Sequence, residues 1–191
     1  MPNGPAYRPA MRILAISGSA RRLSTNTALL RATSAAVAAD HQVRVYDRIA
    51  DLPVFSPDLE LPEPPPMVRD FLRLIGGADG IIISSPEYVR AIPGGLKNAV
   101  DWLVSGDLIT RKPVVLAHAS HRGDDMLAQL RLVLATVSEA FAPEIFLRLD
   151  LMRLSPGQIA AQLAGSQEQA RIRRFVDAFA SHCAAQVVVA R

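Results

Sequence analysis

Short apolar runs alternate with helix-like segments along most of this chain, and this alternation restricts the fold more than any other feature. Three runs flanked by Gly, Ser or Pro are typical of buried parallel strands: MRILAIS at 11–17, GIIISS at 80–85 and PVVLAHAS at 113–120. Edge-like strands are expected at 42–47 and 144–149, and helices at 24–39, 67–75, 94–104, 126–141 and 171–183. The alternation predicts an α/β fold with right-handed crossovers and a five-stranded parallel sheet covered on both faces.

Two strand orders are compatible with this pattern, the dinucleotide-binding order and the flavodoxin-like order 2-1-3-4-5. In both, ligands bind outside the carboxyl ends of the strands, near the point where the strand order reverses. Functional residues are therefore expected in three turns, GSARRLSTN after the first strand, SPEYVRAIPGG after the third and SHRGDD after the fourth.

Composition favours one folded domain over residues 11–185, preceded by a flexible tail at 1–10 that lacks the apolar core of a signal peptide. No apolar run approaches the roughly 20 residues that a membrane span needs. A single cysteine fits a reducing cytoplasm. The net charge of +3 comes from scattered basic residues, which argues against a nucleic-acid partner.

Two segments between the main elements carry turn signals. The proline-rich stretch 53–66 mixes apolar and turn residues, and it predicts an ordered surface loop. Gly76 and Gly77 follow the helix at 67–75, and they predict a left-handed helix stop.

The turn after the first strand has the residue types that bind a phosphate group. Ser19, Ser24 and Asn26 supply hydrogen-bonding side chains, Arg21 supplies a charge, and the following helix supplies outward-pointing N–H groups. The turn lacks G-x-G-x-x-G and G-x-x-x-x-G-K-[ST], which argues against a dinucleotide pyrophosphate and against nucleoside triphosphate hydrolysis. A simpler alternative is that these polar residues only cap the helix.

The two longest turns together resemble the NADPH-dependent FMN reductase family, which includes flavodoxin-like quinone, chromate and azo-dye reductases. The resemblance rests on G-S-x-R-x-x-S-x-N at 18–26 and on P-E-Y-x-x-x-I-P-G-x-L-K-N-A-x-D-W at 86–102, and it covers roughly residues 12–149. It implies the flavodoxin-like strand order and non-covalent FMN. The phosphate would bind to Ser19, Arg21, Ser24 and Asn26.

By the same resemblance, the second turn would line the ribityl chain and the isoalloxazine ring, mostly with backbone groups of Pro86, Glu87, Tyr88 and Val89. The prolines would fix a non-helical backbone whose N–H groups meet the polar edge of the flavin. This role explains why the connection is longer than a strand-to-helix turn requires.

Two positions depart from the family pattern. The family commonly has Asn after PEY, where this chain has Val89. Its third turn is usually glycine-rich, whereas this chain has SHRGDD, with Ser120, His121 and Gly123 as the candidate flavin contacts. His121 could donate a hydrogen bond to a flavin carbonyl or a quinone oxygen.

Other chemically active residues have simpler interpretations. Asp124 and Asp125 suit the negatively charged start of a helix better than a metal site. His118 is expected to be a hydrogen-bonded histidine at a strand end, and Cys183 to be buried and inert. Trp102 is expected to pack, with a second subunit as one candidate partner, rather than to contact substrate.

The sequence thus predicts an FMN-dependent NAD(P)H oxidoreductase that passes hydride through the flavin to a quinone, a flavin or a similar small acceptor. The flavin carries the chemistry, so no catalytic side chain and no metal are expected. The resemblance also implies a homodimer or homotetramer. Two alternatives remain: a binding or regulatory module with weak or lost FMN, and a single-electron carrier, for which the basic composition is unusual.

Overall fold

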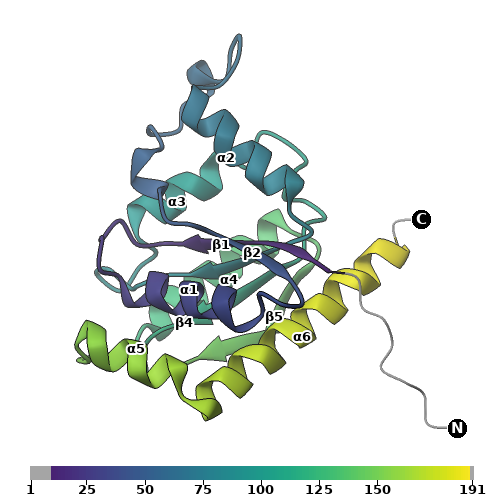
Figure 1. Ribbon diagram of the computed structural model, residues 1–191. Coiled ribbons are helices and arrows are strands. Elements are labelled where there is room, and N and C mark those ends of the chain that lie inside the picture. Colours follow the sequence, from purple (N-terminus) through teal and green to yellow (C-terminus); the bar gives the residue numbers. More distant parts are fainter. Residues whose placement is uncertain (1–9, 190–191) are drawn as a thin grey trace, which may run out of the picture.

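The computed structural model describes residues 10–189, except for the side chains of 187–189. The predicted tail at 1–10 therefore lies almost entirely outside the described residues. Five parallel strands form one sheet in the order β2-β1-β3-β4-β5, which confirms the flavodoxin-like order over the dinucleotide-binding one (Figure 1). The strands are β1 (Arg12–Ser17), β2 (Gln42–Tyr46), β3 (Gly80–Ser84), β4 (Val114–His118) and β5 (Phe141–Arg148).

Helices cover both faces of the sheet, so the fold has three layers (Figure 1). On one face lie α1 (Thr25–Ala36), α5 (Pro156–Ala164) and α6 (Ser166–Val189); on the other lie α2 (Pro66–Gly77), α3 (Gly94–Asp101) and α4 (Asp124–Val137). Alternate residues of β1 point into the two cores: Ile13 and Ala15 pack on the α1 side, Leu14 and Ile16 on the α2 side. Burial on both faces is the reason that the strands appear as unbroken apolar runs.

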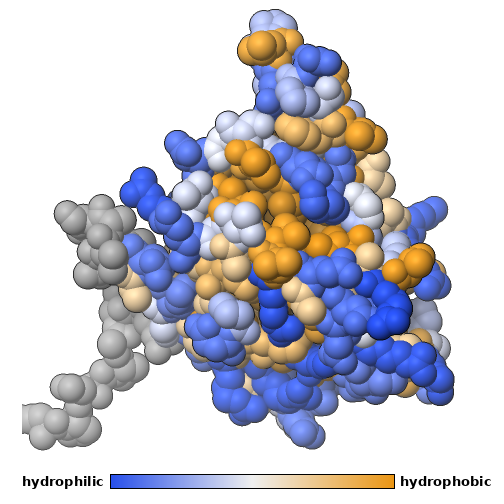
Figure 2. All heavy atoms as spheres, turned by 180° about the vertical axis from the view of Figure 1, so that it is seen from behind, coloured by the Kyte–Doolittle hydropathy of each residue, from blue (hydrophilic) through white to orange (hydrophobic). Residues whose placement is uncertain are grey.

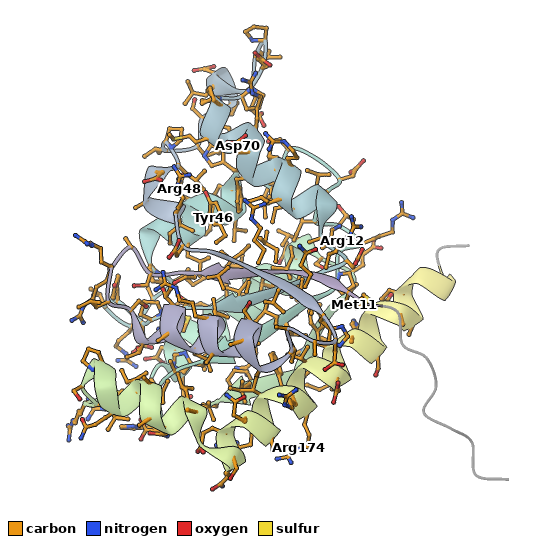
Figure 3. The ribbon with its side chains drawn as sticks, viewed as in Figure 1. Met11, Arg12, Tyr46, Arg48, Asp70 and Arg174 are labelled. Atoms are coloured by element: carbon orange, nitrogen blue, oxygen red, sulfur yellow. The ribbon has the colours of Figure 1, made fainter. Side chains whose placement is uncertain are left out.

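The registers of the strands align their carboxyl ends. Ser17 pairs with Ser84, Ser84 with Ala117, and His118 with Arg148. In Figure 3, Met11 and Arg12 mark the amino end of β1, and Tyr46 and Arg48 lie at the opposite, carboxyl end of β2. The turns that follow β1, β3 and β4 therefore meet at one edge of the molecule.

Several predicted boundaries were wrong. The helix expected to end at Gly76-Gly77 runs through both glycines, and Ala78 after it is extended rather than left-handed. Helix α4 ends at Val137, and β5 already begins at Phe141, because the apolar run continues from one element into the next. Within the predicted surface loop lies a short 3₁₀ turn, η2 (Pro57–Leu59); another, η1 (Ile49–Asp51), precedes it.

Helix α5 was missed, although the sequence carried a start signal for it. Ser155 is its N-cap, and Gln158 closes a capping box in which each side chain bonds the other residue's backbone. Pro156 occupies the first helical position, where its missing N–H costs nothing. Helix α6 is also longer at both ends than the predicted 171–183.

The amino edge of the sheet holds an ion pair that predicts acid sensitivity. Arg12 donates to Asp79 from its backbone N–H at 2.8 Å and from its guanidinium at 3.0 Å. Partial burial acts to raise the pKa of Asp79, but these contacts outweigh it and lower the pKa below the usual value. The pair's contribution to stability is therefore present above the unfolded-state pKa of about 3.9 and is lost as the pH falls through the lower folded-state pKa.

We expect Asp79→Asn to reduce the loss of thermal stability between pH 5 and pH 2.5, because the variant no longer takes up a proton there on unfolding. Melting temperatures across this range test it. Asp58→Asn is the control, since that exposed carboxylate has no ion pair in the described part of the chain. Equal acid slopes for Asp79→Asn and the native protein would contradict the prediction.

Candidate functional site

The three predicted turns meet at the carboxyl edge, and Asn26 joins them. Its buried amide oxygen accepts hydrogen bonds from the Ser84 hydroxyl at 2.9 Å and from the Ala119 N–H at 3.3 Å. Asn26 itself lies in the first turn of α1. This side chain thus connects the start of α1 to the ends of β3 and β4. One of the predicted phosphate ligands therefore also has a structural role at this edge.

The turn after β1 retains free hydrogen-bond donors. Ser24 caps α1 by accepting from the N–H of Thr27, which leaves the N–H groups of Thr25 and Asn26 without an acceptor in the described part of the chain. The buried Ser19 hydroxyl accepts from the Arg21 N–H at 3.2 Å and fixes the turn. The donor set fits a phosphate, because unpaired N–H groups at a helix N-terminus attract anions.

Arg21 and Arg22 extend this donor set into solvent. Both side chains are exposed, and neither guanidinium pairs with an acid within residues 10–189. Two unneutralised positive charges therefore flank the start of α1.

Gly18 is required for the close approach of the first two turns. Its N–H donates to the carbonyl of Ser84 at 2.8 Å. A Cβ at this position would lie 2.6 Å from the Ser85 hydroxyl and 2.8 Å from a methyl of Leu96. The glycine of the G-S-x-R motif is thus explained by packing.

The turn after β3 is a tight hairpin with an unusual backbone. Tyr88 and Ala91 exchange backbone hydrogen bonds of 3.1 and 3.0 Å, and the two residues between them, Val89 and Arg90, have φ angles of 51° and 58°. A β-branched residue is strained in this left-handed region, where Asn and Gly are tolerated. Val89 is also 98 % exposed, so packing contacts do not offset the backbone strain. Strain of this kind is common at functional sites.

Replacing Val89 with Asn should raise the free energy of unfolding by about 1 kcal/mol, because it relieves this left-handed strain. Chemical denaturation measures the change. Val54→Asn is a matched control: Val54 is 81 % exposed, but its φ is not positive, so a change below about 0.5 kcal/mol is expected there. Equal effects at both positions would show that backbone strain at Val89 is not the cause.

Side chains of the hairpin contact the start of helix α4. The Glu87 carboxylate accepts from the N–H of Met126 at 3.0 Å, and Arg90 pairs with Asp125 at 2.6 Å. The Arg90 guanidinium lowers the pKa of Asp125. Gln129 donates to the carbonyl of Arg90 at 2.9 Å. Glu87 therefore caps α4 with its side chain, and its backbone remains for the predicted flavin contact.

The turn after β4 is short and is fixed by hydrogen bonds from Arg148 of β5. The guanidinium of Arg148 donates to the carbonyls of Ser120 and Arg122 at 2.7 and 3.0 Å and to the carboxylate of Asp124 at 2.8 Å. The Ser120 hydroxyl accepts from the Arg122 N–H at 2.9 Å. Sequence analysis missed Arg148, because nothing local indicates that a strand residue serves a turn 25 or so positions earlier.

Gly123 and His121 complete this turn. Gly123 has a φ of 99°, and a Cβ there would lie 2.8 Å from Nε2 of His118. His121 is half exposed, and its Nδ1 lies 2.9 Å from the carboxylate of Asp150, which follows β5. The hydrogen bond from His121 lowers the pKa of Asp150. The side chain of His121 is thus directed toward the β5 side of the edge.

Helix α3 and its C-cap residue Trp102 fix the segment that follows η1. Asn98 accepts from the N–H of Phe55 at 2.8 Å and donates to the carbonyl of Pro53 at 2.9 Å, and Trp102 donates to the same carbonyl at 2.8 Å. The Trp102 side chain is 2 % exposed and meets Phe55 edge to face. The expectation that Trp102 packs against a second subunit is therefore wrong.

The structure agrees with the interpretations of His118, Asp124, Asp125 and Cys183. His118 is buried with both ring nitrogens in hydrogen-bond contact, and Asp124 and Asp125 open α4. Cys183 is buried, and desolvation raises the pKa of its thiol to about 12, so it is unreactive. Within residues 10–189, no three His, Cys, Asp or Glu side chains come together as metal ligands. None of the described helices has the length and apolarity needed to cross a membrane.

A five-stranded parallel sheet in the order 2-1-3-4-5, with unpaired N–H donors in the turn after β1 and two further turns beside it, defines a flavodoxin-like protein. The sequence model of the NADPH-dependent FMN reductase family matches residues 11–148. The chain belongs to this family.

Curated relatives agree with this assignment, and a solved structure shares the fold. The chain is 39 % identical over 114 residues to the NADH:(hydroxy)cinnamate reductase subunit CrdA of Vibrio ruber, which covers 58 % of this chain and 54 % of the relative. It is 34 % identical over 113 residues to a quinone reductase of Escherichia coli K12, covering 58 % and 60 %. The chain thus matches little more than half the length of these relatives. FerB, an NAD(P)H:(acceptor) oxidoreductase of Paracoccus denitrificans, shares the fold with a TM-score of 0.75 at 22 % identity, covering 93 % and 99 % of the two chains.

Proposed function

We propose that this protein is an FMN-dependent NAD(P)H oxidoreductase that reduces a quinone, a flavin or a similar small acceptor. The observation that carries the proposal is the turn after β1, where the N–H groups of Thr25 and Asn26 and the Arg21 guanidinium have no partner in the described part of the chain, a set of donors that suits a phosphate. It occurs in a member of the NADPH-dependent FMN reductase family. Relatives named as quinone reductases support the choice of acceptor.

The chain's own residues would hold and orient the cofactor. Arg21 and the start of α1 would bind the phosphate of FMN, with Ser19, Ser24 and Asn26 fixing the turn. The backbone of 86–89 and the turn at Ser120, His121 and Gly123 would flank the ring. When bound, FMN would accept a hydride from NAD(P)H and deliver the electrons to the acceptor at the same face.

The rigid turns would lower the cost of binding. Arg148 fixes one of them and the Glu87 cap fixes the other, so little ordering remains to be done when the cofactor arrives. The exposed Val89 would present an apolar surface beside the ring.

The competing hypothesis is a binding or regulatory module with weak FMN. It is favoured by the third turn, SHRGDD, whose single glycine gives its backbone less freedom to approach a flavin ring than the glycine-rich turn usual in the family. An FMN titration separates the two. Flavin peaks that shift on binding and bleach with NADPH in the absence of oxygen support the reductase. A lack of binding supports the module.

Replacing Arg21 with Ala should weaken FMN binding by about 1.5–3 kcal/mol, which raises the Kd roughly 10- to 150-fold, because a hydrogen bond to a charged phosphate is lost. Fluorescence quenching of FMN measures the Kd. Arg44→Ala is the control, because Arg44 is equally exposed but lies on β2, outside the turn. An unchanged Kd for Arg21→Ala would remove this residue from the site.

We also infer a cytoplasmic homodimer or homotetramer. Seen from behind, hydrophobic residues gather on the face that carries α3 and α4 (Figure 2). Val104 and Leu132, which are 61 % and 72 % exposed, are among the apolar side chains on this side of the sheet. Light scattering gives the molar mass of the native protein and of Leu132→Lys in solution. A native mass of two or four chains that falls in the variant supports the oligomer, and a native mass of one chain contradicts it.

A further inference from the structure

His118 lies between the two turns that would flank the flavin ring. It is the last residue of β4 and is 1 % exposed. Its Nδ1 is 3.0 Å from the carbonyl oxygen of Ser85, in the turn after β3. Its Nε2 is 2.6 Å from the carbonyl oxygen of Arg122, in the turn after β4. One imidazole ring therefore bridges the two turns.

Both partners of His118 are hydrogen-bond acceptors. A neutral imidazole carries one N–H and one lone pair, so it can donate to only one of the two carbonyls and must turn its lone pair toward the other. An imidazolium carries two N–H groups and satisfies both. The bridge between the turns is therefore complete only when the ring is doubly protonated.

Some groups around His118 raise the pKa of its ring and others lower it. Burial is the largest influence and lowers the pKa of His118; the Arg122 and Ser85 carbonyls raise it; Arg148 lowers it; and Asp124 raises it. Glu87, from the turn after β3, has its Cβ 3.7 Å from the point where a Cβ on Gly123 would lie, but its carboxylate is directed to Met126. The Asn26 side chain from α1 is neutral. Together these influences lower the pKa of His118 below its usual value, so the doubly protonated ring, held by its two carbonyl partners, is populated on the acidic side.

The position of Gly123 independently indicates that the ring is closely enclosed. Any Cβ there would lie 2.8 Å from Nε2 of His118, and Gly123 also has the positive φ that bends the turn over the ring. The turn is thus shaped around the imidazole.

We propose that His118 is a positioning residue of the flavin site, which draws the turns after β3 and β4 together through two N–H donors, so that FMN affinity follows its protonation. This inference rests on the proposed function. By linkage, a ligand that binds the closed arrangement more tightly must also favour proton uptake by His118. FMN should bind more tightly below the midpoint of the His118 titration than above it.

The size of the effect follows from one hydrogen bond gained or lost. We expect Kd for FMN to be roughly 2- to 12-fold larger above the midpoint than below it. The same factor should appear as an upward shift of the His118 midpoint when FMN is bound, by roughly 0.4–1 pH unit.

The first measurement is an NMR titration of protein labelled with ¹⁵N-histidine, with and without saturating FMN, from pH 4 to pH 8, because the pKa of His118 is lowered. The chain has 4 histidines, and the His118 signals are identified by their loss in His118→Asn. Signals of two protonated nitrogens at low pH and an FMN-dependent upward shift of the midpoint support the proposal. A midpoint that is the same with and without FMN, or one neutral tautomer throughout, overturns it.

The second measurement compares Kd for FMN in the native protein and in His118→Asn over the same pH range. The phosphate of FMN also titrates, with a pKa of about 6. The relevant quantity is therefore the Kd of His118→Asn divided by the Kd of the native protein at the same pH. His118 acting through its protonation makes this ratio fall toward high pH, whereas a merely structural role gives a constant ratio and overturns the proposal. His182→Asn is the control, since that ring contacts Ala140 at the amino edge.

The two proposals fail in different ways. If the native protein binds no FMN at any pH, both the proposed function and this inference are wrong. If it binds FMN but the ratio stays constant, only the role of His118 is wrong.

Discussion

Replacing Trp102 with Ala should lower the free energy of unfolding by about 3–5 kcal/mol, the range measured for large aromatic residues in cores. The indole is 2 % exposed, packs edge to face on Phe55 at 5.1 Å, and donates to Pro53 at 2.8 Å. Its loss leaves a cavity between α3 and the segment that follows η1. A typical domain has a total stability of only about 5–15 kcal/mol, so a large shift of the urea midpoint is expected.

Trp102→Phe is the matched control. It keeps most of the aromatic volume and removes the N–H, while Asn98 still donates to Pro53 at 2.9 Å, so a loss of about 1 kcal/mol is expected. A contrary result is easy to define. If Trp102→Ala left the unfolding of the monomer unchanged and only weakened self-association, the indole would lie in an interface between subunits.

Replacing Gly123 with Ala should lower the free energy of unfolding by about 2–5 kcal/mol. A left-handed φ costs a residue with a Cβ roughly 1–2 kcal/mol, and overpacking a buried position typically adds about 1–3 kcal/mol. Both apply here, because φ is 99° and the new methyl would lie 2.8 Å from the His118 ring. Since the turn must move to accommodate the methyl, FMN binding should weaken as well.

Gly94→Ala provides the comparison, because a Cβ there meets nothing within 4 Å and its φ is not positive. It should be neutral or stabilising by about 0.5–1 kcal/mol. Combining Gly123→Ala with His118→Asn should recover part of the loss, since the two residues are in contact. Additive effects in the double variant would show that the cost at Gly123 comes from its backbone alone.

The central strands and the three turns could be predicted because their signals are local. Apolar runs bounded by Gly, Ser and Pro correctly indicated β1, β3 and β4, and helix spacing indicated α1 to α4. The resemblance to the FMN reductases supplied the strand order, and the observed sheet confirmed it. The same local reasoning failed where two apolar elements follow each other directly, as α4 and β5 do.

The internal structure of the candidate site could not be predicted, because its contacts join distant residues. Arg148 serves the turn at 120–124, Glu87 caps a helix that begins at Asp124, and His118 bridges two turns. Each of these side chains has several suitable partners in the sequence, and only the packing of the sheet selects one. The assignment of Ser19, Arg21, Ser24 and Asn26 to FMN, like that of the other candidate contacts, stays a prediction until a ligand is bound.

The amide of Asn26 also bears on how the protein folds. Its oxygen connects α1 to residues that lie 58 and 93 positions further along the chain. Contacts between such distant positions form late, since the intervening chain must first be ordered. A nascent polypeptide that has not yet produced β4 therefore lacks the completed carboxyl edge. Capture of a cofactor there should follow the assembly of the sheet rather than direct it.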